Sequence, residues 1–306
     1  MVRTYVNLTR IRTNVEAIRA RVGVKVIGVV KADAYGIGAV AVADAISDLV
    51  SGFYVFHSDE ALDARLAEVS GKSTLCTVPG ENDDVAFYLE HNIRPAVWTV
   101  ERAARLARAK PVLSVDTGMQ RFACATDQLD AVIQAGQITE AFTHAAKPEQ
   151  ATQLKDLLGG RGLRLHAAAS ALIDVPGCQL DAVRPGLMMF DGAVRVTTPL
   201  IDARPTKGPL GYGGLTNPTG HHGVILVGYS HGLRNGPVLI NGRRQQILEV
   251  GMQSAYVSLD PKDRIGNEVC LLGNELTPQT IGKAWNSTPH EALHRLASLG
   301  EKTYAT

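Results

Sequence analysis

Short apolar runs recur roughly every twenty residues between positions 25 and 183 of this 306-residue chain, and their spacing limits the possible folds. Most of them are separated by segments with helical periodicity, such as 58–69, 99–110 and 126–134. Regular alternation of strand and helix is typical of a parallel sheet, and eight units predict a (β/α)8 TIM-like barrel. The eight predicted strands are 25–30, 53–56, 74–77, 95–98, 112–115, 141–143, 163–165 and 182–183.

A doubly wound open sheet is the second candidate fold. No GxGxxG turn follows any of the predicted strands, which argues against a dinucleotide-binding version of it.

The sequence pattern changes after Val194. Segment 208–223 is rich in Gly, Thr, Asn and Pro, and the apolar runs beyond it are short and bounded by turns. Asn241-Gly242 predicts a tight hairpin turn, and Thr277-Pro278 predicts the start of a helix. We therefore predict a barrel over 9–195 and a mostly β second domain formed by 1–8 and 196–306, with 5–8 adding a strand.

Composition narrows the partners and the compartment. The chain has 31 basic and 30 acidic residues, which gives no reason to expect nucleic acid or a membrane surface as a partner. The four cysteines form no CxxC pair, so we expect buried free thiols in a reducing compartment. The N-terminus lacks the apolar run of a signal peptide, and no stretch approaches the length of a membrane span. A cytoplasmic protein is expected, and no metal site is predicted.

Lys31 ends the first apolar β-branched run and is followed by small residues and two glycines. A lysine in an enclosed apolar place has a lowered pKa, which suits a Schiff-base nucleophile. The alternative to a catalytic role is that Lys31 lies at a strand end and simply extends its amine into solvent. In a (β/α)8 barrel the carboxyl ends of the strands form the active site, so polar residues there are candidates as a group. They are Lys31, Arg121, His144, His166, Ser170 and Arg184.

Segment 29–36, Val-Val-Lys-Ala-Asp-Ala-Tyr-Gly, closely resembles the segment around the cofactor lysine of the alanine racemase family, where Lys-Ala-Asn-Ala-Tyr-Gly is usual. The resemblance implies that Lys31 holds pyridoxal phosphate as a Schiff base on a TIM-like barrel followed by a β-rich domain. It implies a racemase acting on a small amino acid, with alanine as the first candidate. It also implies that Tyr35, Ser170 and the backbone at Gly186 and Leu187 bind the cofactor phosphate.

The resemblance places Arg184 against the pyridine nitrogen of the cofactor. Arginine stays protonated and only donates hydrogen bonds, so that nitrogen remains unprotonated. An unprotonated ring withdraws electrons less strongly than a protonated one. This favours reprotonation at Cα, which is racemisation, over transamination. Arg121 is expected at the phenolic oxygen of the cofactor and near the substrate carboxylate, which the backbone of Met252 also helps to hold.

Racemisation requires two bases, one on each face of Cα. Lys31 is one, and the resemblance of Gly228-Tyr229-Ser230-His231-Gly232 to the family's Gly-Tyr-Ala-Asp-Gly points to Tyr229 as the other. A tyrosine needs a nearby cation to act at neutral pH, and His144, adjacent to Arg184 in the family, is the candidate relay. In the family the tyrosine comes from the second subunit, which implies a homodimer with shared active sites.

Several positions depart from the family pattern, among them Asp33 in place of asparagine and Ile37 in place of histidine after Lys31. Ser114 stands where many alanine racemases have a carbamylated lysine that orients the arginine matched by Arg121, Ala169 replaces a common asparagine, and Gln253 replaces an aspartate. These changes leave open another pyridoxal-phosphate reaction on the same fold, such as a lyase, a decarboxylase or a specialised biosynthetic step. A non-catalytic pyridoxal-phosphate-binding protein is the third possibility.

Overall fold

The computed structural model describes residues 1–69, 71–217 and 219–306. It contains two compact units. One consists of residues 11–34 and 38–190, and the other of 1–10, 35–37 and 191–306. The domain boundaries predicted from the sequence remain a prediction.

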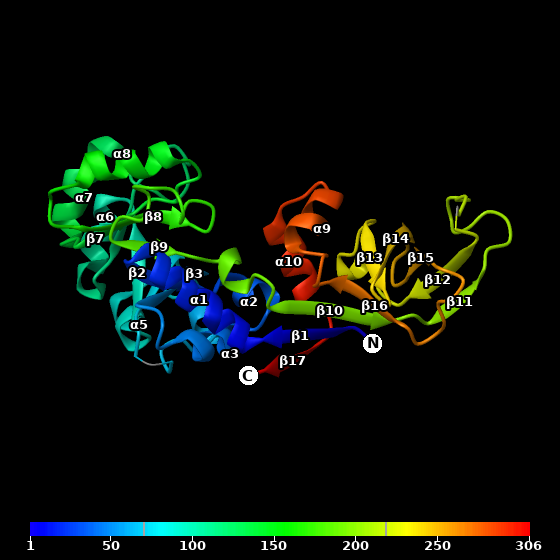
Figure 1. Ribbon diagram of the computed structural model, residues 1–306. Helices are drawn as coiled ribbons and strands as arrows, with labels where there is room; N and C mark the ends of the chain where they lie inside the picture. Colours follow the sequence, from blue (N-terminus) through cyan, green and yellow to red (C-terminus); the bar gives the residue numbers. More distant parts are fainter. Residues whose placement is uncertain (70, 218) are drawn as a thin grey trace. The chain divides into compact units, whose positions relative to one another are not determined.

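The first unit is a closed barrel of eight parallel strands in sequence order (Figure 1). This confirms the predicted (β/α)8 class and rules out the open sheet, because β2 pairs with both β3 and β9. Each predicted apolar run overlaps a strand. The strands are β2 (Lys25–Val29), β3 (Gly52–His57), β4 (Thr74–Val78), β5 (Ile93–Val97), β6 (Val112–Ser114), β7 (Glu140–Phe142), β8 (Arg164–Ala169) and β9 (Ala182–Arg184).

Helices with one apolar face follow most of the strands. In α8 (Pro148–Leu158), Ala151, Leu154 and Leu158 recur every three or four residues and are buried. Polar side chains begin several of these helices; Thr99, for example, accepts a hydrogen bond from the Arg102 N–H. The others are α3 (Ala39–Ile46), α4 (Ser58–Asp63), α5 (Val85–Glu90), α6 (Val100–Leu106) and α7 (Leu129–Gly136), with 3-10 turns η1 (Ala107–Ala109), η2 (Thr126–Gln128) and η3 (Leu187–Phe190).

The segment Thr13-Asn14-Val15-Glu16 matches a capping box and predicts a helix start at Thr13, but the first helix, α1 (Leu8–Val22), begins five residues earlier. Asn7 is the cap, since its side-chain oxygen accepts the Arg10 N–H at 2.7 Å. The strand β1 (Arg3–Asn7) runs directly into the helix. A local capping pattern inside the helix was therefore misleading.

The second unit is built on a nine-stranded sheet in the order β11-β12-β15-β14-β13-β16-β10-β1-β17. The predicted hairpin at Asn241-Gly242 is confirmed, with φ of 48° and 76° between β13 and β14. A β-rich second domain is thus confirmed. Its later strands are β10 (Val194–Pro199), β11 (Asp202–Pro205), β12 (His221–Ile225), β13 (Pro237–Ile240), β14 (Arg243–Val250), β15 (Ala255–Ser258), β16 (Glu268–Leu272) and β17 (Glu301–Ala305).

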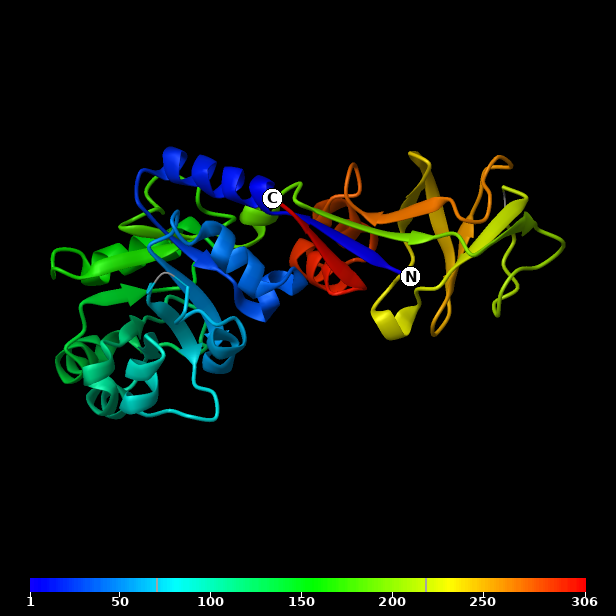
Figure 2. The same cartoon turned by 90° about the horizontal axis from the view of Figure 1, so that it is seen from below.

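The two ends of the chain share this sheet. β1 pairs antiparallel with β10 and parallel with β17, and the blue and red strands run side by side in Figure 2. Two helices, α9 (Pro278–Ala284) and α10 (Pro289–Ala297), precede β17. Thr277 caps α9 by accepting the Thr280 N–H, as its sequence predicts.

All four cysteines are free and buried, which confirms that expectation. Among the residues that the structure describes, no helix has the length and apolar character needed to cross a membrane.

Candidate active site

Three of the predicted site residues lie at one rim of the barrel. Lys31 follows β2, Arg184 is the last residue of β9, and Ser170 follows β8. β9 pairs with β2 on one side and β8 on the other, and all three strands run in the same direction. Their carboxyl ends therefore meet at one edge, as the (β/α)8 fold requires.

Lys31 lies among charged and aromatic groups. Its Nζ is 5.9 Å from the centre of the Phe56 ring on β3. Burial lowers the pKa of the Lys31 amine, and the positive charges of Arg121 and Arg184 lower it further, while the carboxylate of Glu60 acts in the opposite direction. An amine with a lowered pKa is the nucleophile that Schiff-base formation requires.

The backbone after Lys31 forms a left-handed turn, α2 (Lys31–Gly36). Ala32, Asp33, Ala34 and Tyr35 have φ between 50° and 62°. L-residues avoid this region at about 1–2 kcal/mol each, so four in succession cost roughly 4–8 kcal/mol. Such strain persists only where surrounding contacts impose it, and it is concentrated at functional sites.

Arg184 is a buried cation with fixed hydrogen bonds. Its side chain donates to Nδ1 of His166 and, at 2.7 Å, to the carbonyl of Thr143, and its guanidinium lies 4.9 Å from the centre of the Phe142 ring. Burial lowers its pKa to about 10, so it remains protonated at neutral pH. Arg184 therefore presents an oriented, permanent donor at the rim.

His166 and Glu140 continue this hydrogen-bonded chain below the rim. Arginine only donates, so Nδ1 of His166 is the acceptor and Nε2–H donates to Glu140 Oε1 at 3.0 Å. Burial and the charge of Arg184 lower the pKa of His166 to about 4, which keeps it neutral. Burial opposes ionisation of Glu140, but bonds from His166 and from Arg94 and Arg164 outweigh it and hold its pKa well below the usual range.

Ser170 gathers backbone donors. Its Oγ accepts the N–H of Gly186 at 3.0 Å and the N–H of Met188 at 3.2 Å. Leu187 lies between these two residues and begins η3. A hydroxyl and converging backbone N–H groups at a strand end form a suitable place for an anion.

Arg121 lies in the loop after β6. Asp116 shapes the loop, since its Oδ1 accepts the N–H groups of Gly118 and Gln120. Among the ion pairs that the described residues form, none involves Arg121. Its guanidinium carbon instead lies 5.5 Å from the centre of the Phe56 ring. Ser114, on β6, is buried and cannot form a carbamate.

The second unit brings Tyr229 and Met252 close to each other. The Tyr229 N–H donates to the carbonyl of Gly251, and Ser230 donates to that of Met252. The segments approach so closely that a Cβ at Gly228 would lie 2.3 Å from the carbonyl oxygens of Gly251 and Met252. Tyr229 and Met252 are 56% and 58% exposed.

Tyr35 also belongs to the second unit and is nearly buried, with its ring centre 6.0 Å from that of His290. The Tyr304 hydroxyl donates to the Ile37 carbonyl at 3.0 Å. In the barrel unit His144 follows β7 and is exposed, one residue beyond the Thr143 carbonyl that Arg184 contacts. The roles predicted for Tyr35 and His144 remain predictions.

Three neighbours of the site have no role predicted from the sequence: Glu140, Glu60 and Phe56. His166 is among the candidate polar residues at strand ends, but the sequence does not predict its hydrogen bond with Arg184. Glu60 has one signal in the sequence, its position three residues after His57, the N-cap of α4, as in a capping box. The other two carry no pattern that separates them from ordinary strand residues.

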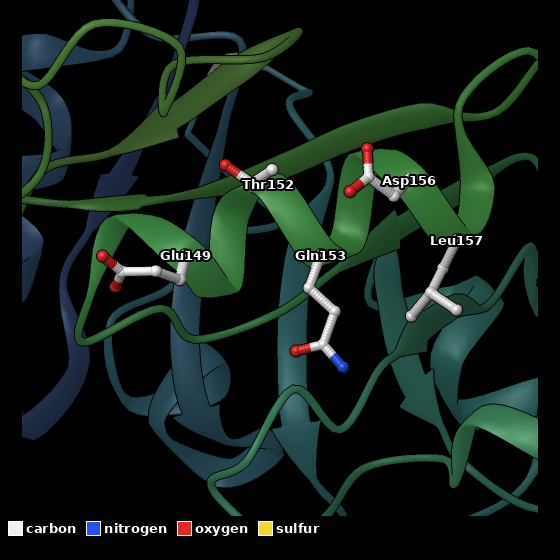
Figure 3. Close-up of a pocket in the computed structure, with 5 residues that line it drawn as sticks. All are labelled: Glu149, Thr152, Gln153, Asp156 and Leu157. Carbon is white, nitrogen blue, oxygen red and sulfur yellow. The ribbon is translucent and has the colours of Figure 1, made fainter.

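A hollow on the outside of the barrel unit lies away from these residues. Figure 3 shows the side chains that line it, all of which project from α8. None is a predicted site residue; they are Glu149, Thr152, Gln153, Asp156 and Leu157.

Comparison with known proteins identifies the family. Residues 6–193 match the model described as the N-terminal domain of alanine racemase. The alanine racemase of Pectobacterium atrosepticum is 30% identical, with 95% of each chain covered, and that of Haemophilus influenzae is 29% identical over 94% of this chain and 93% of the relative.

Solved structures have the same fold. The biosynthetic alanine racemase of Pseudomonas aeruginosa matches with a TM-score of 0.89 at 24% identity, covering 100% of this chain and 99% of that one. The Bartonella henselae alanine racemase, solved with covalently bound pyridoxal phosphate, matches with a TM-score of 0.86 at 22% identity, covering 99% of both chains. By its family match and its near full-length relatives, this chain belongs to the alanine racemase family.

Proposed function

We propose that the protein is a pyridoxal-phosphate-dependent racemase that interconverts the L and D forms of a small amino acid, with alanine as its substrate. The observation that carries the proposal is Lys31 at the barrel rim, with a lowered pKa and with the cations Arg121 and Arg184 acting on it. Relatives named alanine racemase support the choice of reaction and substrate. A neighbour of the same fold binds L-Ala-P, which supports an alanine-like ligand.

The donor set at the rim fits pyridoxal phosphate. Lys31 offers an amine for the aldehyde, Ser170 with the N–H groups of Gly186 and Met188 offers a phosphate site, and Arg184 offers a donor for the ring nitrogen. The family resemblance adds Tyr35 and Leu187 to the phosphate site. When bound, this cofactor withdraws electrons from the amino acid and acidifies its Cα–H.

Arg184 is proposed to direct the reaction towards racemisation. Its Nη1 and Nη2 groups donate to His166, Thr143 and Ala167, which fixes the guanidinium plane. With a pKa of about 10, it donates a hydrogen bond and keeps its proton. A pyridine nitrogen held against it would therefore gain no proton from it, which would disfavour transamination.

Lys31 and Tyr229 are proposed as the two bases. Lys31 takes or returns the Cα proton on one face, and Tyr229 does so on the opposite face. Arg121 holds the substrate carboxylate together with the backbone of Met252. Tyr229 and Met252 are each more than half exposed in the single chain, which suits residues that act on a second subunit. We therefore propose a homodimer with shared active sites. We also propose that it acts in the cytoplasm, because its free cysteines suit a reducing compartment.

The test is exchange of the Cα hydrogen. Purified protein supplied with pyridoxal phosphate is incubated with L-alanine, L-serine and a wider amino-acid panel in heavy water. Deuterium at Cα with formation of the D enantiomer supports the proposal. No deuterium across the panel contradicts it, and release of aldehyde or carbon dioxide instead assigns a different reaction to the same site.

A further inference from the structure

We propose that Glu60 is a positioning residue for Lys31: its carboxylate joins the peptide bond that follows the lysine to the junction between β3 and α4, and so aims the amine. The catalytic consequence rests on the function proposed above, whereas the positioning of the amine does not.

The geometry consists of three hydrogen bonds to one carboxylate. Oε1 of Glu60 accepts the N–H of Ala32 at 2.7 Å. Oε2 accepts the N–H of Phe56 at 2.8 Å and that of His57 at 3.1 Å. Each oxygen therefore faces a different segment, and the carboxylate is the bridge between them.

Glu60 holds the peptide bond between Lys31 and Ala32, where the strained left-handed turn begins. The Ala32 N–H belongs to the peptide unit whose carbonyl is that of Lys31, and Ala32 is the first residue of the left-handed turn. Later parts of the turn are held by its own segment, since Ala34 N–H donates to Val30 and Ala39 N–H donates to Asp33. The Ala32 N–H instead donates to a side chain from α4.

A carboxylate suits this position better than any other side chain of its length. Both of its oxygens accept hydrogen bonds, so it can serve N–H groups on two sides. A glutamine would direct an NH2 group at one set of N–H donors. An aspartate would keep the charge but lack the length to reach both segments.

Glu60 also acts on the Lys31 amine through its charge. The groups that face the amine are Arg121 from the loop after β6, Arg184 from β9, the Phe56 ring from β3 and Glu60 from α4. Burial and the two arginines disfavour the ammonium form, and Glu60 favours it. Removing the Glu60 charge therefore lowers the pKa of Lys31 further.

Two variants of Glu60 and a matched control separate the effect of the carboxylate charge from the effect of the side-chain length. Glu60→Gln removes the charge, Glu60→Asp keeps it and shortens the side chain, and Asp59→Asn changes the adjacent carboxylate, which pairs with His57. Thermal unfolding followed by circular dichroism verifies that each full-length variant is folded.

The first readout is the amine itself. In the full-length protein freed of cofactor, acetylation of Lys31 by acetic anhydride is measured against pH by peptide mass spectrometry, with Lys302 as the internal reference. We expect the reactivity curve of Glu60→Gln to move to lower pH and the curves of Glu60→Asp and Asp59→Asn to stay in place.

The second readout is kcat/KM for alanine in the enzyme loaded with cofactor. A displacement of about 1 Å in a reacting group can cost on the order of 100-fold, so we expect Glu60→Gln and Glu60→Asp to fall by about 10- to 100-fold. Asp59→Asn should remain within about twofold of the wild type.

The proposal is overturned if Glu60→Gln behaves like Asp59→Asn in both readouts, or if Glu60→Asp retains the wild-type kcat/KM. A wild-type protein without racemase activity, in which Glu60→Gln still moves the acetylation curve, would contradict the proposed function and leave the positioning role supported.

Discussion

The guanidinium of Arg121 lies over the ring of Phe56, with 5.5 Å between the guanidinium carbon and the ring centre. Phe56 in turn packs edge-on against Phe122 at 5.9 Å between ring centres, and Phe122 contacts Trp98 at 5.7 Å. A ring face attracts a cation without neutralising it. The aromatic rings therefore orient Arg121 without neutralising its charge, which stays available to an anionic partner. Ser114, on the strand before this loop, carries no negative charge that could orient Arg121 instead.

Replacing Phe56 tests this arrangement. Phe56→Leu keeps an apolar side chain but removes the ring face, and we expect KM for the amino acid to rise about two- to fivefold, the size of an exposed cation–π contact. Phe56→Tyr keeps the ring face and should retain the wild-type KM. Steady-state kinetics measure both, and equal KM values for the two variants would contradict the role of the ring.

His166 makes stability depend on pH in a predictable direction. Its pKa is about 4 in the folded protein against an ordinary 6.5, so below pH 6.5 the unfolded chain binds a proton that the folded chain does not. Stability is therefore complete above about pH 6.5 and falls as the pH falls. We expect His166 to contribute a loss of about 2 kcal/mol between pH 7 and pH 5, measured by urea unfolding.

The control for this prediction is His166→Asn, whose unfolding free energy should change less between the same two pH values. The comparison stops at pH 5 because the lowered pKa of Glu140 adds its own loss below its ordinary value of 4.5. The assignment fails if the two proteins have the same pH dependence.

Glu140 is the anionic centre of the network beneath Arg184. It is 2% exposed and receives bonds from His166, Arg94 and Arg164. Removing one partner of a buried ion pair leaves the other charge uncompensated, so Glu140→Gln should lose about 3 kcal/mol of unfolding free energy at pH 7. Glu68→Gln, which removes an exposed pair with Arg65, should change it by less than about 0.5 kcal/mol. A loss below about 1 kcal/mol for Glu140→Gln would contradict this account.

The proposed second base predicts a selective loss. Tyr229→Phe removes only a hydroxyl, and we expect racemisation of alanine to fall by about 100- to 10,000-fold, the range of one acid–base group. The absorption spectrum of the bound cofactor should change little, because Lys31 is intact. Tyr212→Phe is the control, since Tyr212 is 93% exposed in the same unit. If Tyr229→Phe racemises alanine at the wild-type rate, Tyr229 is not the second base; if neither protein shows any activity while the cofactor spectrum is present, a non-catalytic cofactor-binding role becomes the better explanation.

The sequence predicts the barrel because its signal is repeated along the chain. The apolar runs are short, helical segments separate most of them, and only a closed sheet satisfies both edges of eight parallel strands. The hairpin at Asn241-Gly242 was equally readable, since both residues tolerate the positive φ that the turn requires.

The local environment of the site could not be read in the same way. Nothing in Ala32, Asp33 or Ala34 predicts a left-handed turn, because L-residues avoid that conformation and only the surrounding contacts impose it. The bond between His166 and Arg184 joins residues 18 apart, and the cation–π contact joins Phe56 on β3 to Arg121 in the loop after β6. Such pairings follow from the closure of the barrel and from side-chain packing, which a single sequence does not specify.

The central claim is a covalent bond between the Lys31 amine and pyridoxal phosphate. The direct measurement is reduction of the cofactor-loaded protein with borohydride, followed by peptide mass spectrometry and by measurement of the visible absorption band of the Schiff base. The account predicts loss of that band and a phosphopyridoxyl group on the peptide containing Lys31 and on no other. A peptide with unmodified Lys31 after reduction in the presence of ample cofactor would contradict it.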